Sequence, residues 1–196
     1  VDKVKGEVLW QKLQKTIKTA IRMQDNVIDK TTYFLDENEK QALGERRVGL
    51  GIMGLHDLLI WCNKKYGDDD ANELVDELFK FIAINAYETS IEIAKEKGSF
   101  PFLEEQGSRE KFIETGYMKK LPEYIRQDVL KYGIRNSLLV APMPTASTAQ
   151  ILGNNECFEP FTSNIYTRRT IAGEFIIVNK YLMKELIELN LWNEQI

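Results

Sequence analysis

The feature that most constrains the fold is a short apolar run, residues 137–140, which leads directly into a polar loop bounded by prolines. Pro142 and Pro144 lack the N–H group that a central ladder requires, so a buried strand must end just before them. A helix then begins within the loop, because Ser147 and Gln150 have the spacing of a capping box. The pattern therefore predicts a strand that delivers a hydroxyl-rich loop to a helix N-terminus.

The predicted helix start has the chemistry of an anion site. Thr145 and Ser147 bring hydroxyl groups and free backbone N–H groups into one small volume. A helix N-terminus carries about half a positive charge, which favours a phosphate without any basic side chain. A loop of this kind can also cap a helix and bind nothing, and the loop residues alone favour that structural interpretation.

A longer match surrounds the loop. Residues 142–156 read PMPTASTAQILGNNE, residues 159–169 read EPFTSNIYTRR and residues 173–175 read GEF. Together with residues 132–137 and 49–55, these segments resemble the large (α) subunit of ribonucleotide reductase in its aerobic class I form. Essentially the whole chain aligns, but only with an interior part of the family's catalytic region.

The resemblance implies the fold class. It implies a helix-rich α/β segment, in which residues 1–196 form a single, incomplete part of the family's ten-stranded α/β barrel. This part would supply outer helices, a few strands and the loop. Because the chain opens on Val1 without an initiating Met, an excised domain, a processed product or a gene fragment is expected.

The resemblance also assigns a substrate site. In the family, the Pro-Thr-Ala-Ser-Thr loop holds the phosphates of the ribonucleotide. The corresponding residues are Pro144, Thr145, Ala146, Ser147 and Thr148. No catalytic residue and no metal ligand is expected in this chain, because the family's Asn-x-Cys-x-Glu motif lies upstream of it and the tyrosine pair of the radical pathway lies beyond its end. The chain alone is therefore expected to be inactive.

For the full subunit, the resemblance implies a cytoplasmic ribonucleoside-diphosphate reductase, a radical enzyme that replaces the ribose 2′-hydroxyl by hydrogen and supplies deoxyribonucleotides for DNA replication. It implies a ribonucleoside diphosphate substrate, a radical-generating small (β) subunit as partner, and a homodimer of large subunits. No cofactor would bind this chain directly. A metal-radical cofactor would lie in the partner subunit, and a thiol reductant would supply electrons.

Three alternatives stay open. The chain could be a split-gene product that needs another polypeptide, a non-catalytic nucleotide-binding fragment, or part of a cobalamin-dependent (class II) reductase. The Pro-Thr-Ala-Ser-Thr form of the loop favours class I over class II.

Composition argues against nucleic-acid and membrane partners. The net charge is −4, and no run of 18 apolar residues is present. One basic stripe has the spacing of a solvated helix face. Its members are Lys12, Lys15, Lys18 and Arg22.

Several motifs imitate functional sites but are expected to be structural. Residues 49–54 read GLGIMG, yet no buried strand precedes them, so the glycines are expected to permit close helix packing rather than to bind a dinucleotide.

The acids at 68–70 cannot all face one way on a helix, which favours a helix start over a magnesium site. His56, the only histidine, is expected to be packed or on the surface. Cys62 and Cys157 lack zinc or disulfide spacing and are expected to be packed thiols.

Two charged pairs lie close to the loop. Glu156 and Glu159 could do acid/base work, but a structural role at the turn before Pro160 is expected. Arg168 and Arg169 alternate along a predicted strand, so one should point inward, where it could pair with a buried carboxylate or contact phosphate directly.

Hydrophobic periodicity predicts mainly helices elsewhere. The predicted helices cover about residues 7–28, 50–63, 68–98, 107–115, 122–132 and 179–189, and the predicted strands cover residues 137–140 and 164–167.

Overall fold

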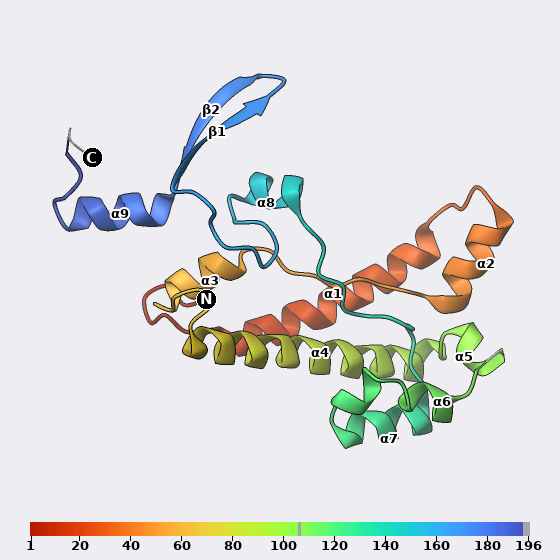
Figure 1. Cartoon of the computed structure of the whole chain (residues 1–196). Coiled ribbons are helices and arrows are strands. Elements are labelled where there is room, and N and C mark those ends of the chain that lie inside the picture. The colour runs from red at the N-terminus through yellow and green to blue at the C-terminus, as the bar shows by residue number, and fades with distance from the viewer. Residues whose placement is uncertain (106, 194–196) are drawn as a thin grey trace.

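The computed structural model of the chain describes residues 1–105 and 107–193. Helices dominate this part of the chain (Figure 1). The elements are α1 (Trp10–Lys30), α2 (Asp36–Glu45), α3 (Leu55–Trp61), α4 (Asp69–Lys97), α5 (Pro101–Glu105), α6 (Arg109–Ile113), the 3-10 helix η1 (Met118–Lys120), α7 (Glu123–Tyr132), α8 (Ala146–Leu152), the strands β1 (Ile165–Thr170) and β2 (Gly173–Val178), and α9 (Lys180–Glu188).

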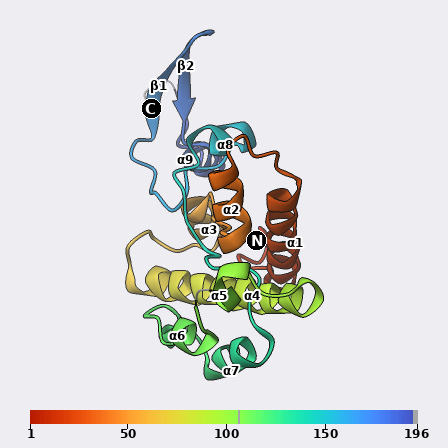
Figure 2. The ribbon, with the colours of Figure 1, turned by 90° about the vertical axis from the view of Figure 1, so that its right-hand side faces the viewer.

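The two longest helices, α1 and α4, lie side by side and build the core (Figure 1). Ile17 and Ile21, two members of the apolar stripe predicted for the first helix, are buried in one cluster with Leu78 and Ile82 of α4. Hydrophobic periodicity therefore located both helices correctly. The shorter helix α7 packs against α4, α6 packs against α7, and α5 contacts α2 and α6 (Figure 2).

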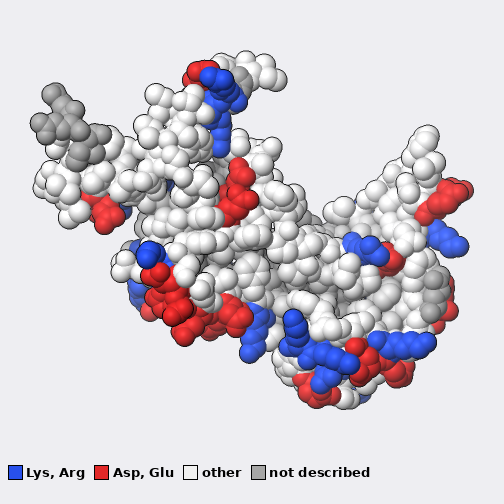
Figure 3. Space-filling model, in the orientation of Figure 1, with Lys and Arg blue, Asp and Glu red and all other residues white. Residues whose placement is uncertain are grey.

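Charged side chains follow the pattern expected of solvated helix faces. In the basic stripe of α1, Lys18 Nζ lies 3.3 Å from Glu92 Oε1 and Arg22 Nη1 lies 2.7 Å from Glu96 Oε2, so the stripe is partly neutralised by α4. Acidic side chains gather on the surface over the beginning of α4 (Figure 3). None of the helices in residues 1–105 and 107–193 combines the length and the apolar character needed to cross a membrane.

A buried polar cluster, missed by the sequence analysis, links the C-terminal halves of α1 and α4 to Arg46 and Asn136. The Asp25 carboxylate of α1 is fully buried and accepts hydrogen bonds from Arg46 Nε (2.9 Å) and from Asn136 Nδ2 (3.1 Å). Asn136 Nδ2 also donates to the Arg46 carbonyl, and the Asn136 backbone N–H donates to Ser90 Oγ of α4 at 3.0 Å. The cluster therefore fixes the point at which the chain leaves α7 and enters the 137–140 run.

The strand predicted over residues 137–140 is not a regular strand, and this prediction is corrected. The segment is extended and lies parallel to residues 48–50, with Val48 N donating to Leu138 O (3.0 Å), Leu50 N to Leu139 O (2.8 Å) and Ala141 N to Leu50 O (3.0 Å). Two parallel segments of this length make too few ladder bonds to form a sheet without further strands. In the described residues the fold is therefore mixed helical with a small sheet, not a closed barrel.

That small sheet is the antiparallel hairpin β1–β2, which projects from the body of the molecule (Figure 1). The extended run predicted at residues 164–167 is confirmed as the beginning of β1. Tyr166 pairs with Ile177 and Arg168 with Phe175 in the register. The following helix, α9, begins where the Asn179 side chain accepts hydrogen bonds from the Tyr181 and Leu182 amides, an N-cap.

Candidate functional site

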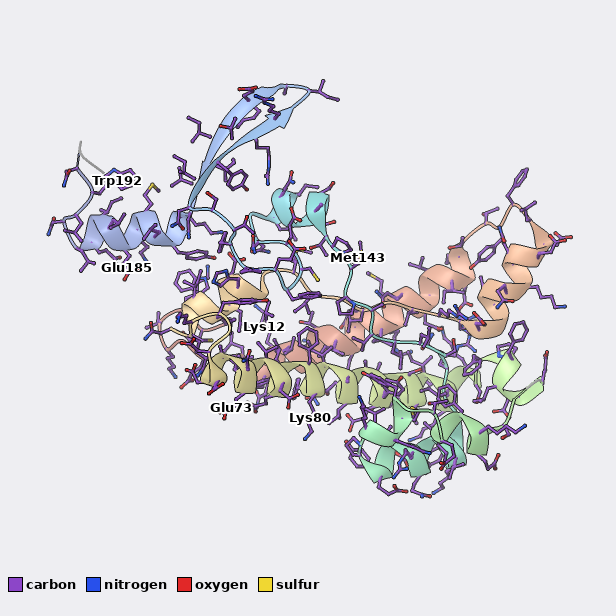
Figure 4. All side chains as sticks on the ribbon, viewed as in Figure 1. Lys12, Glu73, Lys80, Met143, Glu185 and Trp192 are labelled. Carbon is purple, nitrogen blue, oxygen red and sulfur yellow. The ribbon has the colours of Figure 1, made fainter. Side chains whose placement is uncertain are left out.

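The 144–148 loop leads into α8, which begins at Ala146 rather than at the predicted capping box. Thr145 is the N-cap residue, in a left-handed conformation with φ 56° and ψ 21°, and Ser147 already lies inside the first turn. The capping box predicted for Ser147 and Gln150 is therefore wrong. Figure 4 shows the approach to α8 from the labelled Met143, which is exposed.

Thr145 points into the protein. It is only 7% exposed, and its Oγ1 accepts a hydrogen bond from the Cys157 amide at 2.9 Å. Its carbonyl oxygen accepts the first helical bond of α8, from Ala149 N at 2.8 Å. A β-branched residue in this backbone region is strained by about 1–2 kcal/mol. The two hydrogen bonds hold it there, so the Thr145 hydroxyl orients the loop from inside.

The next three residues form the outward face of the loop. Ala146, Ser147 and Thr148 are exposed, and they precede Ala149, the first residue whose N–H group bonds within the helix. In an α-helix these early N–H groups have no intrahelical acceptor. The outward face of the loop therefore carries three backbone N–H groups without an intrahelical acceptor and the side chains of two exposed hydroxyl residues.

A segment that we call the return loop, residues 154–161, runs from α8 back along the N-terminus of α3. Gly54 N donates to Asn155 O (3.0 Å) and Leu55 N donates to Cys157 O (3.2 Å). In the reverse direction, Asn155 N donates to Asp57 Oδ2 at 2.7 Å. The return loop is thus paired with the start of α3 by three hydrogen bonds.

His56 holds the far end of the return loop. Its Nδ1 accepts a hydrogen bond from Phe161 N at 2.8 Å, which requires this nitrogen to be unprotonated. Burial lowers the pKa of His56, and the neighbouring Asp57 charge opposes that shift. The single histidine is a structural acceptor and not a catalytic base in this arrangement.

Asp57 connects the return loop to α9. Besides the Asn155 amide, its carboxylate accepts a hydrogen bond from the Tyr181 hydroxyl, and Lys180 Nζ lies 3.8 Å from Oδ1. Burial, followed by the contact with Asp57, raises the pKa of the Tyr181 phenol well above its ordinary value. The buried Asp57 carboxylate is thus surrounded by one backbone N–H group of the return loop and by two side chains of α9.

A pocket of about 240 Å³ lies between α8, the return loop and the hairpin. Gln150, Glu156, Tyr166, Arg168 and Lys180 are among the residues that line it. Arg168 Nη2 donates to the Tyr166 hydroxyl at 3.1 Å, while Arg169 pairs with its cross-strand neighbour Glu174 at 2.7 Å. One arginine therefore faces the pocket, as predicted from the alternation, but in the described residues its bonded partner is a phenol and not a buried carboxylate.

The acidic candidates lie at a turn and at a helix start. Glu159 N donates to Glu156 O at 3.0 Å, which closes the turn expected before Pro160. At the start of α4, Asp70 pairs with Lys64 at 2.8 Å and Asp68 with Lys65 at 3.2 Å. No group of three His, Cys, Asp or Glu side chains in the described part of the chain could hold a metal ion.

The glycine motif serves a close approach of backbone segments. A Cβ atom at Gly51 would lie 3.1 Å from Ala141 O, and one at Gly49 would lie 3.3 Å from Ala141 Cβ. The helix predicted from residue 50 begins only at Leu55, after Gly54 in a left-handed conformation (φ 74°). Gly49 and Gly51 thus pack against the end of the extended 137–141 run, and the prediction that they pack a helix is corrected.

Comparison with known proteins gives a consistent result. The family model described as ribonucleotide reductase, barrel domain, matches residues 1–196. The chain is 40% identical over 195 residues to the ribonucleoside-diphosphate reductase large chain of Schizosaccharomyces pombe, covering 96% of this chain and 24% of that protein. It is 38% identical to the large chain of Neurospora crassa (94% of this chain, 21% of that protein) and 38% identical to the large subunit of Variola virus (98% and 26%). The chain spans about a quarter of the length of these relatives.

Proposed function

Because the chain belongs to the ribonucleotide reductase barrel-domain family, we propose that it is the part of a large subunit that holds the phosphates of a ribonucleoside diphosphate. The whole of residues 1–196 would act as one segment of a ten-stranded barrel. In that barrel, the paired runs at residues 48–50 and 138–141 would be neighbouring strands completed by further strands. This proposal follows the diphosphate reductases named among the relatives rather than a cobalamin-dependent enzyme.

The observation that carries the proposal is the outward first turn of α8. Ala146, Ser147 and Thr148 offer backbone N–H groups, and the last two add hydroxyl donors, at the positive end of the helix dipole. Thr145 contributes by fixing the turn from inside, and Pro144 by limiting the backbone before it.

Such a site suits a reductase that must accept different bases. Contacts to phosphate position a nucleotide without reading its base, so a loop of backbone donors places every substrate in the same way. Chemistry on the ribose would then be supplied by residues outside this chain. We propose that a small subunit with a metal-radical cofactor starts the radical, that a thiol reductant returns the electrons, and that large subunits pair as a homodimer.

Titration of the 196-residue chain with ADP, pyrophosphate and adenosine tests the proposal. Pyrophosphate carries the recognised group without a base, and adenosine carries the base without phosphate. We expect ADP and pyrophosphate to shift the amide resonances of Ala146, Ser147 and Thr148, and adenosine to leave them in place. Equal shifts with adenosine, or no shift with either phosphate compound, would refute the assignment.

A further inference from the structure

Asp57 lies outside the 144–148 loop but is bonded to the segment that supports it. The residue is 6% exposed, and Oδ2 accepts the Asn155 amide at 2.7 Å while Oδ1 accepts the Tyr181 hydroxyl. A buried carboxylate is costly unless donors surround it, so these contacts fix both its position and theirs.

The contact continues from the return loop to the start of α8. Two residues after Asn155, the Cys157 amide donates to Thr145 Oγ1, and the Cys157 carbonyl accepts from Leu55 N of α3. Thr145 in turn is the residue whose strained backbone starts α8. A short bonded path therefore runs from Asp57 through Asn155 and Cys157 to Thr145.

We propose that Asp57 is a positioning residue for the 144–148 loop, an inference that rests on the proposed function of that loop. Its carboxylate anchors Asn155 to α3, and this anchor keeps Cys157 where it can hold Thr145 in the left-handed conformation. Without the Asp57 carboxylate, the Asn155 N–H group loses the acceptor that it has in the described structure. The orientation of the three outward N–H groups of residues 146–148 is then no longer fixed.

The test compares Asp57→Ala with Tyr181→Phe in the 196-residue chain. Asp57→Ala removes both hydrogen bonds to the carboxylate, whereas Tyr181→Phe removes only the bond from the phenol and leaves the acceptor for Asn155 N intact. We expect Asp57→Ala to speed amide hydrogen exchange at Asn155, Cys157 and Ala149, the bonded amides of this path, by about tenfold, the loss of one hydrogen bond to a charged group. Tyr181→Phe should change exchange at these amides by about twofold or less, because its effect stays on α9.

Asp57→Asn provides the second variant if Asp57→Ala fails to fold. An asparagine retains one side-chain oxygen for the Asn155 amide, and the Tyr181 hydroxyl can turn to accept from its NH₂ group. Exchange at Asn155, Cys157 and Ala149 should therefore stay within about threefold of wild type, and exchange at Ile17 and Ile82 in the α1–α4 core should be unchanged in every variant.

Two results would overturn the inference. One is unchanged exchange at Cys157 and Ala149 in Asp57→Ala, and the other is an equal increase in Tyr181→Phe, which would make Asp57 an anchor for α9 alone. Pyrophosphate affinity is measured in parallel and should fall about tenfold in Asp57→Ala. Amide exchange is measured without ligand and therefore tests the role of Asp57 in ordering the loop. Failure of the wild-type chain to bind pyrophosphate would refute the proposed function of the loop and would leave the exchange result unaffected.

Discussion

The Thr145 hydroxyl accepts a hydrogen bond from the Cys157 amide at 2.9 Å, and both residues have left-handed backbone conformations, with φ of 56° and 39°. Two non-glycine residues in this region, twelve positions apart, support each other across the base of the 144–148 loop. The sequence predicts that the Thr145 hydroxyl contributes to an anion site. In the structure this hydroxyl instead accepts a hydrogen bond that stabilises the base of the loop.

Thr145→Val should destabilise the chain, because valine keeps the shape of threonine but offers no acceptor to the buried Cys157 amide. We expect a loss of about 1–3 kcal/mol in the free energy of unfolding, measured by urea denaturation. Thr145→Ser should recover most of it. The matched control is the exposed Thr148→Val, which should change stability by less than about 0.5 kcal/mol. Equal losses at positions 145 and 148 would contradict the role of the Thr145 hydroxyl.

Ser147→Pro should weaken binding of pyrophosphate. Proline removes one outward N–H group and disfavours the helical conformation of Ala146 before it. We expect the dissociation constant, measured by calorimetry, to rise by about tenfold. Ser147→Ala keeps the N–H group and removes only the hydroxyl, so its dissociation constant should rise by about threefold or less. A larger effect of alanine than of proline would assign recognition to the side chain instead of the backbone.

Asp25→Ala should be among the most damaging substitutions. It leaves the Arg46 guanidinium, whose side chain is 4% exposed, without the buried carboxylate that receives two of its N–H groups. Removing one member of a buried ion pair costs about 3–5 kcal/mol. The exposed pair Lys18–Glu92 offers the control, since Lys18→Met should cost no more than about 1 kcal/mol. Thermal or urea unfolding measures both, and similar losses would argue against a desolvated cluster.

The stability of the fold should fall as the solution is acidified through the range in which His56 titrates. Its pKa in the folded chain lies below the ordinary value of 6.5, so below that value the unfolded chain takes up the proton first. The contribution of neutral His56 to the free energy of unfolding is fully present above pH 6.5. It is lost as the pH falls towards the lowered pKa of the folded chain. Protonation also removes the acceptor for Phe161 N.

His56→Gln isolates this effect, because His56 is the only histidine and a glutamine oxygen can still accept a hydrogen bond without titrating. We expect the difference in unfolding free energy between wild type and variant, measured by urea denaturation from pH 5 to pH 8, to favour the variant increasingly at low pH. A difference that does not depend on pH would exclude His56 as the source.

Much of the architecture could be predicted from local patterns. The apolar spacing that includes Ile17 and Ile21 located α1, and a similar stripe located α4, because a helix face repeats over a few residues and needs no knowledge of its partner. The family itself could be identified from the 142–175 region, where a long, nearly uninterrupted match constrains more than any single motif.

The tertiary structure decided where the polar side chains point. Sequence placed Thr145 in an anion site, but only the folded return loop brings Cys157 N to its hydroxyl. Asp57 and Asn155 are 98 positions apart, and Asp25 and Asn136 are 111 apart, so no local pattern could pair them. The 137–140 run also depended on distant partners, because an extended segment becomes a strand only when neighbouring segments bond to it along its length. Local periodicity thus determined the long helices α1 and α4, and the motif match determined the family, whereas hydrogen-bond partners across the chain depended on packing that no short segment encodes.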